Sequence, residues 1–464
     1  MIKRVENILN DIFKLEVNKL YIDKFTIFTV YISMLFMMIP RYVLDVTGSS
    51  MAENIFHGIY FVFLIPYLYI FIHNIKNKYH KNSIDFVLLT IYLLIVSIST
   101  MFCSNPFLSL LGNTSRNDGL LTLFIYYLIY VDSKNIRDKN DVMKIINIFL
   151  IYALLSTIYA LVQVYLPSNI FSAKYFGHMG YGFQGNPNFF GTYTLLFSLI
   201  SLFITLFISN NKLYKMSTIA IYIGLVLAQS SGPFFTFIFM LFILIIYILI
   251  KRRDLIKKII VWLVIFISLF GIVNYSLIYV NKNIYGVEVG EHYTISGDIK
   301  SIVDTLYNYF NKNNISSDEL HYETDVITSS RLTATDEVIK YIKRDNHIWL
   351  GSGIDNLNIY TLRETDNDNM VFLIFDKAHN IYLNIVAETG IFSFIAYISW
   401  MIIVLVYGIK SKNKYVYLLL FGLIGYNIQG IFNINVIYVM PYYYILTGMM
   451  MGLIEGDRHE SRKH

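Results

Sequence analysis

Apolar runs of about 15 to 23 residues recur along the chain, and short polar stretches separate most of them. Crossing the hydrocarbon core of a bilayer takes a helix of about 20 apolar residues. The pattern therefore predicts an all-α fold, a polytopic membrane protein with about twelve transmembrane helices. The predicted spans are residues 25–44, 56–74, 84–103, 119–132, 145–166, 187–208, 216–230, 233–250, 259–280, 379–408, 415–436 and 438–454.

One polar interval, residues 281–378, is much longer than the others and divides the apolar runs into two groups. We expect an N-terminal bundle of about nine spans at 25–280 and a C-terminal bundle of about three spans at 379–454. Residues 1–24 and 455–464 flank these bundles, and 1–24 show no cleavable signal peptide.

The basic residues are distributed unevenly between the two sides of the predicted bundle. Segments on the side of the N-terminus hold 25 Lys and Arg, whereas the other side holds 12, nine of them in residues 281–378. The positive-inside rule then places both termini in the cytoplasm and the long loop outside. Frequent Ile, Asn, Lys, Tyr and Phe indicate an A+T-rich bacterial genome, so we expect the bacterial cytoplasmic membrane and an extracytoplasmic loop.

The charge and cysteine content narrows the possible functions. Only 15% of the 464 residues are charged, against about a quarter in a soluble domain. The long loop has sixteen acidic and nine basic residues, which argues against a nucleic-acid surface. Cys103 is the only cysteine, which excludes an intramolecular disulfide and a Cys-based metal site. Asp366-Asn367-Asp368 is interpreted as a solvated acidic turn, and we expect no metal or cofactor.

The stretch 378–390, where the long loop meets an apolar run, carries the strongest chemical signal. Asp376 can cap a helix here, which would place His379 at the third helical position, where the helix dipole favours neutral imidazole. Three polar residues then share one helix face at every fourth position, namely Asn380, Asn384 and Glu388. A carboxylate inside an apolar run, such as Glu388, needs a partner or a wet cavity. A helix cap with a polar packing contact is the alternative interpretation.

Other polar motifs lie on the same predicted outer face. Arg116 lies in the loop before the fourth span, and an interfacial ion pair with Asp118 would explain it structurally. Asn186-Pro187-Asn188 opens the sixth span, where Asn186 can cap the helix and Pro187 can take its first position.

The long loop itself contains an amphipathic pattern from Ser329 to Arg344, which predicts a helix. The predicted apolar face is Leu332, Val338, Ile339 and Ile342. Arg331 would lie in the first turn, where the helix dipole disfavours a cation unless an anion binds there. The predicted turn Gly351-Ser352-Gly353 follows the helix.

Together these motifs resemble the O-antigen ligase and O-antigen polymerase superfamily. The resemblance runs from about residue 100 to 408 and includes Gly185-Asn186-Pro187-Asn188, Ser330-Arg331, Gly351-Ser352-Gly353, His379-Asn380-Ile381-Tyr382-Leu383 and Glu388-Thr389-Gly390. It implies a membrane glycosyltransferase of the C-type architecture with its catalytic elements in the large extracytoplasmic loop. It also implies glycan donors on undecaprenyl diphosphate, and it maps the family histidine to His379 and the loop arginine to Arg331.

The sequence departs from the family pattern at two positions. Family members usually carry Ser-Arg-Gly after the seventh span, and here Ser231 replaces that arginine. The loop motif often has Trp four residues after its arginine, and here the residue is Thr335. Three outer-face cations are candidates to replace the missing charge at the diphosphate, namely Arg116, Lys174 and Arg363.

The resulting hypothesis is a metal-independent polymerase of surface polysaccharide repeat units, or a ligase that passes the glycan to a glycan, lipid or protein acceptor, in capsule or cell-wall biosynthesis. His379 is the expected general base, and Arg331 with Arg116 is expected to bind the diphosphate. Asn380, Asn384, Glu388, Asn186 and Asn188 are expected to support the site. Two alternatives stay open, a non-catalytic family member that binds glycan and a transporter of lipid-linked glycans.

Overall fold

The computed structural model describes residues 19–37, 51–76, 83–113, 116–166, 179–283, 295, 297, 299–300, 334–343, 347–364, 370–435 and 437–461. For residues 19–20, 51–61, 360–374 and 459–461 it describes the backbone alone.

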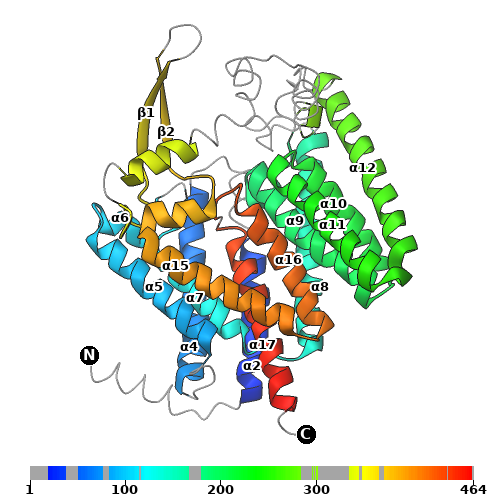
Figure 1. The fold of residues 1–464 in the computed structure, drawn as a ribbon, viewed down its shortest axis with the longest axis horizontal. Helices are drawn as coiled ribbons and strands as arrows, with labels where there is room; N and C mark the ends of the chain where they lie inside the picture. The colour runs from blue at the N-terminus through cyan, green and yellow to red at the C-terminus, as the bar shows by residue number, and fades with distance from the viewer. Residues whose placement is uncertain are drawn as a thin grey trace.

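These residues form a bundle of long helices, shown in Figure 1. The long helices are α2 (Lys19–Phe36), α4 (Met51–Lys76), α5 (Ile84–Phe102), α7 (Leu120–Ser133), α8 (Lys139–Tyr165), α9 (Pro187–Phe203), α10 (Lys212–Leu227), α11 (Ser231–Lys251), α12 (Ile256–Asn283), α15 (Ile381–Lys410), α16 (Lys414–Gln429) and α17 (Met440–Ser461). Each of the predicted spans overlaps one of them. Among the described residues, six helices are long and apolar enough to cross a membrane. The helical, polytopic fold is therefore supported, and twelve crossings stay a prediction.

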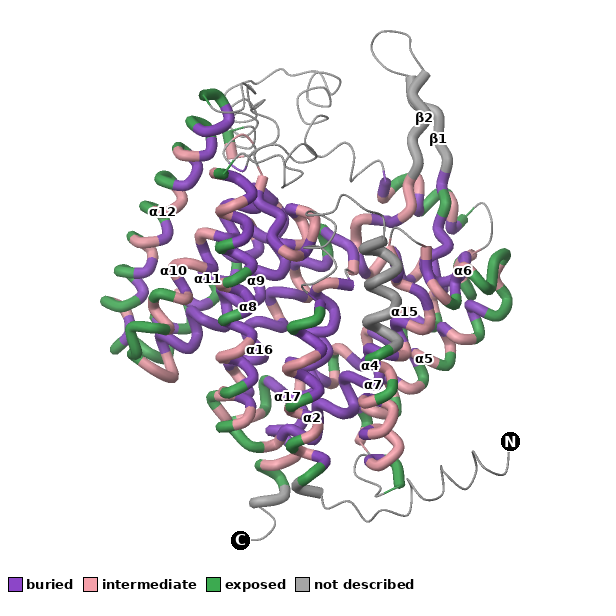
Figure 2. Tube along the Cα trace, turned by 180° about the vertical axis from the view of Figure 1, so that it is seen from behind, coloured by how far each residue is buried: buried purple, intermediate pink, exposed green. Residues whose placement is uncertain are grey.

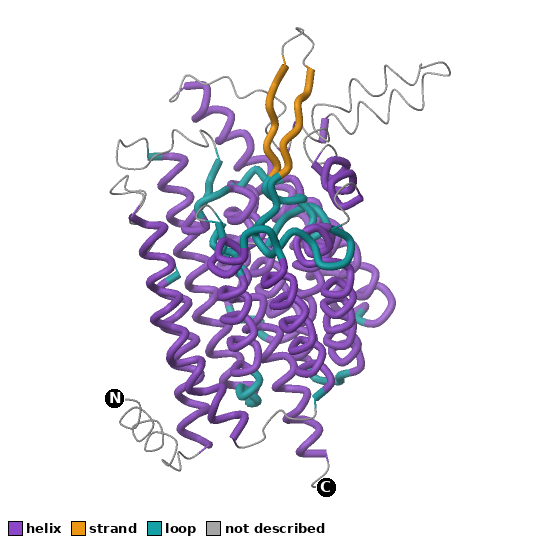
Figure 3. Tube along the Cα trace, turned by 90° about the vertical axis from the view of Figure 1, so that its left-hand side faces the viewer, coloured by secondary structure: helices purple, strands orange, loops and turns teal. Residues whose placement is uncertain are grey.

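Shorter elements complete the chain. They are α6 (Pro106–Leu111), the 3-10 turns η1 (Gly182–Gln184) and η3 (Arg253–Leu255), the π-helical turn η2 (Ile204–Ile208) and the strands β1 (Ile359–Glu364) and β2 (Met370–Phe375). The strands pair antiparallel, with Ile359 opposite Phe375, and this hairpin was not predicted from the sequence. Figure 3 shows the hairpin projecting from one end of the bundle, and α17 ends at the opposite end.

Helix α9 lies at the centre of the bundle, and its side chains are almost all buried. It packs against α8, α10, α11 and α16. Aromatic rings pack edge to face in this region. The ring centroids of Tyr193, Phe197 and Tyr442 lie 4.9 to 5.5 Å apart. Helix α12 lies at the edge and alternates between buried and exposed residues in Figure 2. Exposed apolar side chains such as Ile267 and Tyr275 are typical of a surface that faces lipid.

A sharp break at Gly390 divides α15 and sets the geometry of the large loop. Gly390 has φ 85° and ψ 173°, and a Cβ there would lie 2.0 Å from the Trp349 carbonyl oxygen. The predicted turn Gly351-Ser352-Gly353 fills the break, and a Cβ on Gly351 would lie 2.2 Å from the Glu388 carbonyl carbon. The amide of Ile391 donates to the carbonyl of Ile348 at 2.8 Å. Glycine is required on both sides because the two backbones touch.

Candidate functional site

The loop of residues 376–380 joins β2 to α15 and carries His379. Asn380, not Asp376, caps the helix, because its side-chain oxygen accepts the amides of Tyr382 and Leu383 at 2.9 and 3.0 Å. His379 therefore precedes the helix, and its prediction as the third helical residue is wrong. Its φ is 51°, a left-handed conformation that a non-glycine residue rarely adopts.

Two residues of the polar stripe on α15 bind the part of the loop that directly precedes His379. Asn384 Oδ1 accepts the backbone amide of Ala378 at 3.0 Å. Glu388 Oε1 accepts a hydrogen bond from Lys377 Nζ at 2.8 Å. The predicted stripe is thus present, and Lys377 is the partner that the carboxylate of Glu388 needs. The stripe fixes the backbone that presents His379, which is itself half-buried.

A buried charge cluster lies beneath the loop and consists of Lys377, Asp118, Asp355 and Glu388. Lys377 Nζ lies 2.8 Å from Glu388 Oε1, 2.9 Å from Asp355 Oδ1 and 3.8 Å from Asp118 Oδ2. Lys377 is only 1% exposed, and Asp355 and Glu388 are 4% exposed. The lysine ammonium occupies the point where the carboxylates converge, and no group of three or more potential metal ligands occurs among the described residues. Sequence reasoning did not identify Lys377 or Asp355.

Asp355 connects this cluster to the loop that carries Arg116. Its Oδ2 accepts the backbone amides of Asn113 at 2.7 Å and Asp118 at 3.2 Å. Four non-glycine residues in the described part of the chain have positive φ, and three of them, Asn117, Asp355 and His379, belong to this cluster or lie within two residues of it in sequence. Such backbone strain collects where a surrounding network fixes one conformation, often at functional sites.

Arg116 pairs with Asp376 and not with Asp118, so the predicted partner is wrong. Arg116 Nε and Nη2 donate to the two carboxylate oxygens of Asp376 at 2.6 and 3.1 Å. Burial alone would raise the pKa of Asp376, but the hydrogen bonds and charge of Arg116 outweigh burial, so the net pKa lies below its usual value. The ion pair is partly exposed, at 27% and 33% for the two side chains. Arg116 is therefore held to the same loop as His379.

The polar residues at the start of α9 form a separate group. Asn186 caps α9 by accepting the Asn188 amide at 2.8 Å, and Pro187 takes the first position, as predicted. Asn188 Oδ1 accepts the Ser230 hydroxyl at 2.6 Å. Ser231 begins α11 at the position of the family arginine.

Several predicted residues lie outside the described residues. These are Arg331, Lys174 and Asp366-Asn367-Asp368, and for Arg363 only the backbone is described.

Residues 334–343 are helical, as the amphipathic pattern predicts. Val338 and Ile342 are buried in a cluster with Leu357, Ile359, Ala378 and Ala387. Ile339, however, is 37% exposed and does not belong to the buried face. The helix thus packs against the base of the hairpin and the start of α15.

The stability of the folded protein should fall as pH rises, because of Asp118. Burial, opposed by Lys377 and reinforced by Asp355, raises the pKa of Asp118 from 3.8 to about 8. The folded state therefore binds a proton that the unfolded state has lost, and this stabilisation disappears between about pH 4 and pH 8. Asp118→Asn should flatten the melting temperature of the detergent-solubilised protein over that range. An unchanged slope in this variant would assign the pH dependence to another group.

The comparisons with known proteins agree with these motifs. Residues 216–398 match the family model described as O-Antigen ligase. The match runs from α10 to the middle of α15, so it contains His379 and Arg331 but not Arg116, Asn186 or Asn188. A search of the curated proteins found no match. The family match covers less than half of the chain and supports the resemblance to the O-antigen ligase and O-antigen polymerase superfamily that is seen in the sequence.

Proposed function

We propose that this chain transfers glycan from an undecaprenyl-diphosphate-linked donor to an acceptor hydroxyl on the extracytoplasmic face of the bacterial cytoplasmic membrane. The observation that carries the proposal is the fixed loop 376–380. It holds His379 in a left-handed conformation through Lys377, Asn380 and Asn384, and through Asp376 it holds Arg116. A strained, half-buried histidine in a loop that also binds an arginine suits base-assisted transfer from a diphosphate.

In the proposed reaction, His379 accepts the proton of the acceptor hydroxyl while that oxygen attacks the anomeric carbon of the donor. The bond from the anomeric carbon to the diphosphate oxygen breaks, and undecaprenyl diphosphate leaves with the electron pair. Arg331 and Arg116 neutralise the leaving diphosphate, since guanidinium groups bind phosphate oxygens in pairs without a metal. The Asp376 carboxylate already accepts two hydrogen bonds from Arg116, so the incoming diphosphate displaces that carboxylate from the guanidinium.

The reaction class includes both polymerases and ligases. We favour a polymerase of surface polysaccharide repeat units, in which the acceptor is another lipid-linked glycan. A ligase would use the same base and the same diphosphate contacts, with a different lipid or protein acceptor. Both versions require loop 281–378 to lie outside, as the charge distribution predicts.

The purified protein in liposomes with an undecaprenyl-diphosphate oligosaccharide tests the proposal. We expect the wild type to release undecaprenyl diphosphate and to form glycan longer than one repeat unit. Arg331→Ala should lower the initial rate by about 10²-fold or more, and Arg331→Lys should recover little, because lysine does not bind phosphate in a bidentate way. Wild-type rates in Arg331→Ala at an equal amount of folded protein would remove this arginine from the mechanism.

A second candidate function is a non-catalytic family member that binds lipid-linked glycan. Two observations favour it: Ser231 stands at the position of the family arginine, and Asp376 neutralises Arg116. This candidate predicts saturable binding of the donor with no release of undecaprenyl diphosphate by the wild type. The same liposome experiment therefore separates the two functions.

A further inference from the structure

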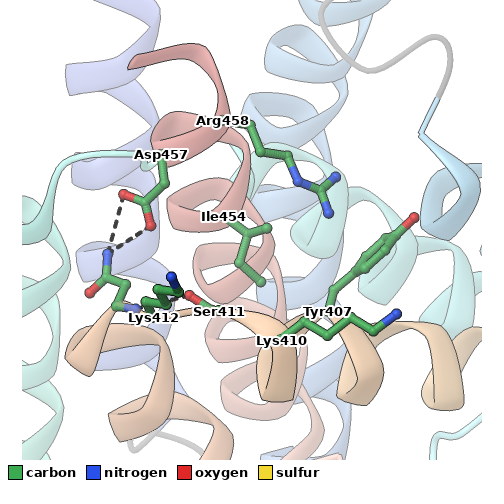
Figure 4. A pocket seen from close by; sticks show the side chains of 8 residues that line it. Tyr407, Lys410, Ser411, Lys412, Ile454, Asp457 and Arg458 are labelled. Atoms are coloured by element: carbon green, nitrogen blue, oxygen red, sulfur yellow. Dashed lines mark hydrogen bonds between the residues drawn. The ribbon is translucent and has the colours of Figure 1, made fainter. Parts of the chain in front are cut away.

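A cleft of about 520 Å³ lies at the end of the bundle opposite the hairpin, far from His379 along α15. Figure 4 shows that it is formed by the end of α15, the turn to α16 and the last turns of α17. Its lining residues are Tyr407, Lys410, Ser411, Lys412, Asn413, Ile454, Asp457 and Arg458. Ile454 is buried and forms an apolar floor, whereas the lysines and Arg458 are exposed at the rim.

The cleft carries an excess of positive charge. Three of its lining residues are cationic and one, Asp457, is anionic. The carboxylate of Asp457 accepts hydrogen bonds from Asn413 Nδ2 at 3.1 and 3.4 Å, so its hydrogen-bond donor is a neutral amide. No ion pair forms between Lys410 or Lys412 and a carboxylate in the described part of the chain. The Arg458 guanidinium lies 4.6 Å from the centre of the Tyr407 ring, which fixes its position over the cleft.

Helix α15 carries an exposed apolar face that leads toward the cleft. Phe392, Ile395, Ile402 and Ile409 are 50 to 61% exposed on this helix. Ile409 is the last of them and directly precedes Lys410. The polar rim of the cleft therefore begins where the exposed apolar face of α15 ends, which is the level of the phospholipid headgroups in a bilayer.

We propose that this cleft binds the headgroup of an anionic phospholipid in the leaflet on the side of the C-terminus. The headgroup phosphate lies among Lys410, Lys412 and Arg458, and the acyl chains run along the apolar face of α15. Basic pockets between transmembrane helices are known sites for acidic headgroups, and each nearby cation adds to the affinity. The site would join α15, whose other end carries the His379 loop, to the C-terminal helix.

Native mass spectrometry of the purified protein tests the site, with dioleoylphosphatidylglycerol and dioleoylphosphatidylcholine as probes. The wild type should retain phosphatidylglycerol in preference to phosphatidylcholine. The variant Lys410→Gln/Lys412→Gln/Arg458→Gln should lose about 100-fold in apparent affinity for phosphatidylglycerol, as the loss of three cations predicts. Lys410→Arg/Lys412→Arg should bind as the wild type does.

A matched control removes the same number of charges at the same predicted end of the bundle but outside the cleft. Lys251, Lys257 and Lys258 are exposed, and none of them lines the cleft. The variant with glutamine at all three should keep the wild-type affinity. An equal loss of phosphatidylglycerol affinity in this control would show that general surface charge causes the effect, and it would overturn the proposal. Competition by millimolar inorganic phosphate as strong as that by phosphatidylglycerol would also overturn it, because it would show a free-anion site.

Discussion

Replacing Lys377 with methionine will abolish glycan transfer and destabilise the folded protein by about 3 to 5 kcal/mol. The lysine is 1% exposed and is the counter-ion of Asp355 and Glu388, at 2.9 and 2.8 Å. Methionine has a similar volume but no charge, so it leaves two buried carboxylates unpaired. Removal of one member of a buried ion pair is far more costly than loss of an exposed pair.

The effect on transfer has a separate cause. Lys377 lies two residues before His379, and its bond to Glu388 fixes the loop against α15. The carboxylate of Asp355 also accepts the amides of Asn113 and Asp118, so the same cluster positions the loop of Arg116. We therefore expect Lys377 to act as a positioning residue for both proposed site residues. Transfer rate per folded molecule, measured beside the melting temperature, distinguishes this role from a purely structural one.

Lys134 provides the control, because it is a second buried lysine with two acidic partners. Its Nζ lies 2.6 Å from Asp85 Oδ2 and 2.8 Å from Glu455 Oε1, in a group that joins α5, α7 and α17. Lys134→Met should cost a similar amount of stability, yet the protein that remains folded should transfer glycan at close to the wild-type rate. If both variants kept that rate, Lys377 would have no role in positioning the site.

The helices of this fold could be predicted from the sequence because apolar periodicity and length determine them directly. The cap at Asn186 and the turn at Gly351-Ser352-Gly353 were also predictable, since they depend on neighbouring residues. The hairpin was missed. Its strands carry β-branched and aromatic residues from Ile359 and Met370 onward, and the acidic residues between them were interpreted as a solvated turn alone.

The charge cluster could not be predicted in the same way, because its members are distant in sequence. Asp118 and Lys377 are separated by most of the bundle and the large loop, and only tertiary packing brings them together. Glu388 did indicate that a partner existed, since a buried carboxylate needs one. Asp376 was assigned as the helix cap because it precedes an apolar run, but Asn380 lies closer to that run and Arg116 binds Asp376.

Replacing His379 with glycine will remove transfer while leaving the folded protein as stable as the wild type. A positioned general base typically contributes about 10²- to 10⁴-fold in rate. The backbone of His379 has φ 51°, which glycine adopts without the steric cost that other residues meet. Glycine removes that strain, but it loses more backbone conformational freedom on folding than histidine does. The two effects oppose each other, so we expect the free energy of unfolding to change by less than about 1 kcal/mol. His379→Ala keeps the strain and should lose the same activity.

His347 is the matched histidine control, because it lies in the same segment between α12 and α15. It is half-buried, and its Nδ1 lies 3.1 Å from the carbonyl oxygen of Gly351, so it supports the turn that packs at Gly390. His347→Gln should lower the melting temperature slightly through that contact and leave the transfer rate nearly unchanged. Loss of activity in His347→Gln equal to that in His379→Gly would show that the loop is merely sensitive to substitution.

The most direct test of a catalytic His379 is the initial rate of undecaprenyl diphosphate release by wild-type and His379→Gly protein in liposomes, at equal amounts of folded protein. We expect a fall of at least about 10²-fold in the variant with an unchanged melting temperature. Release at the wild-type rate by His379→Gly would contradict it.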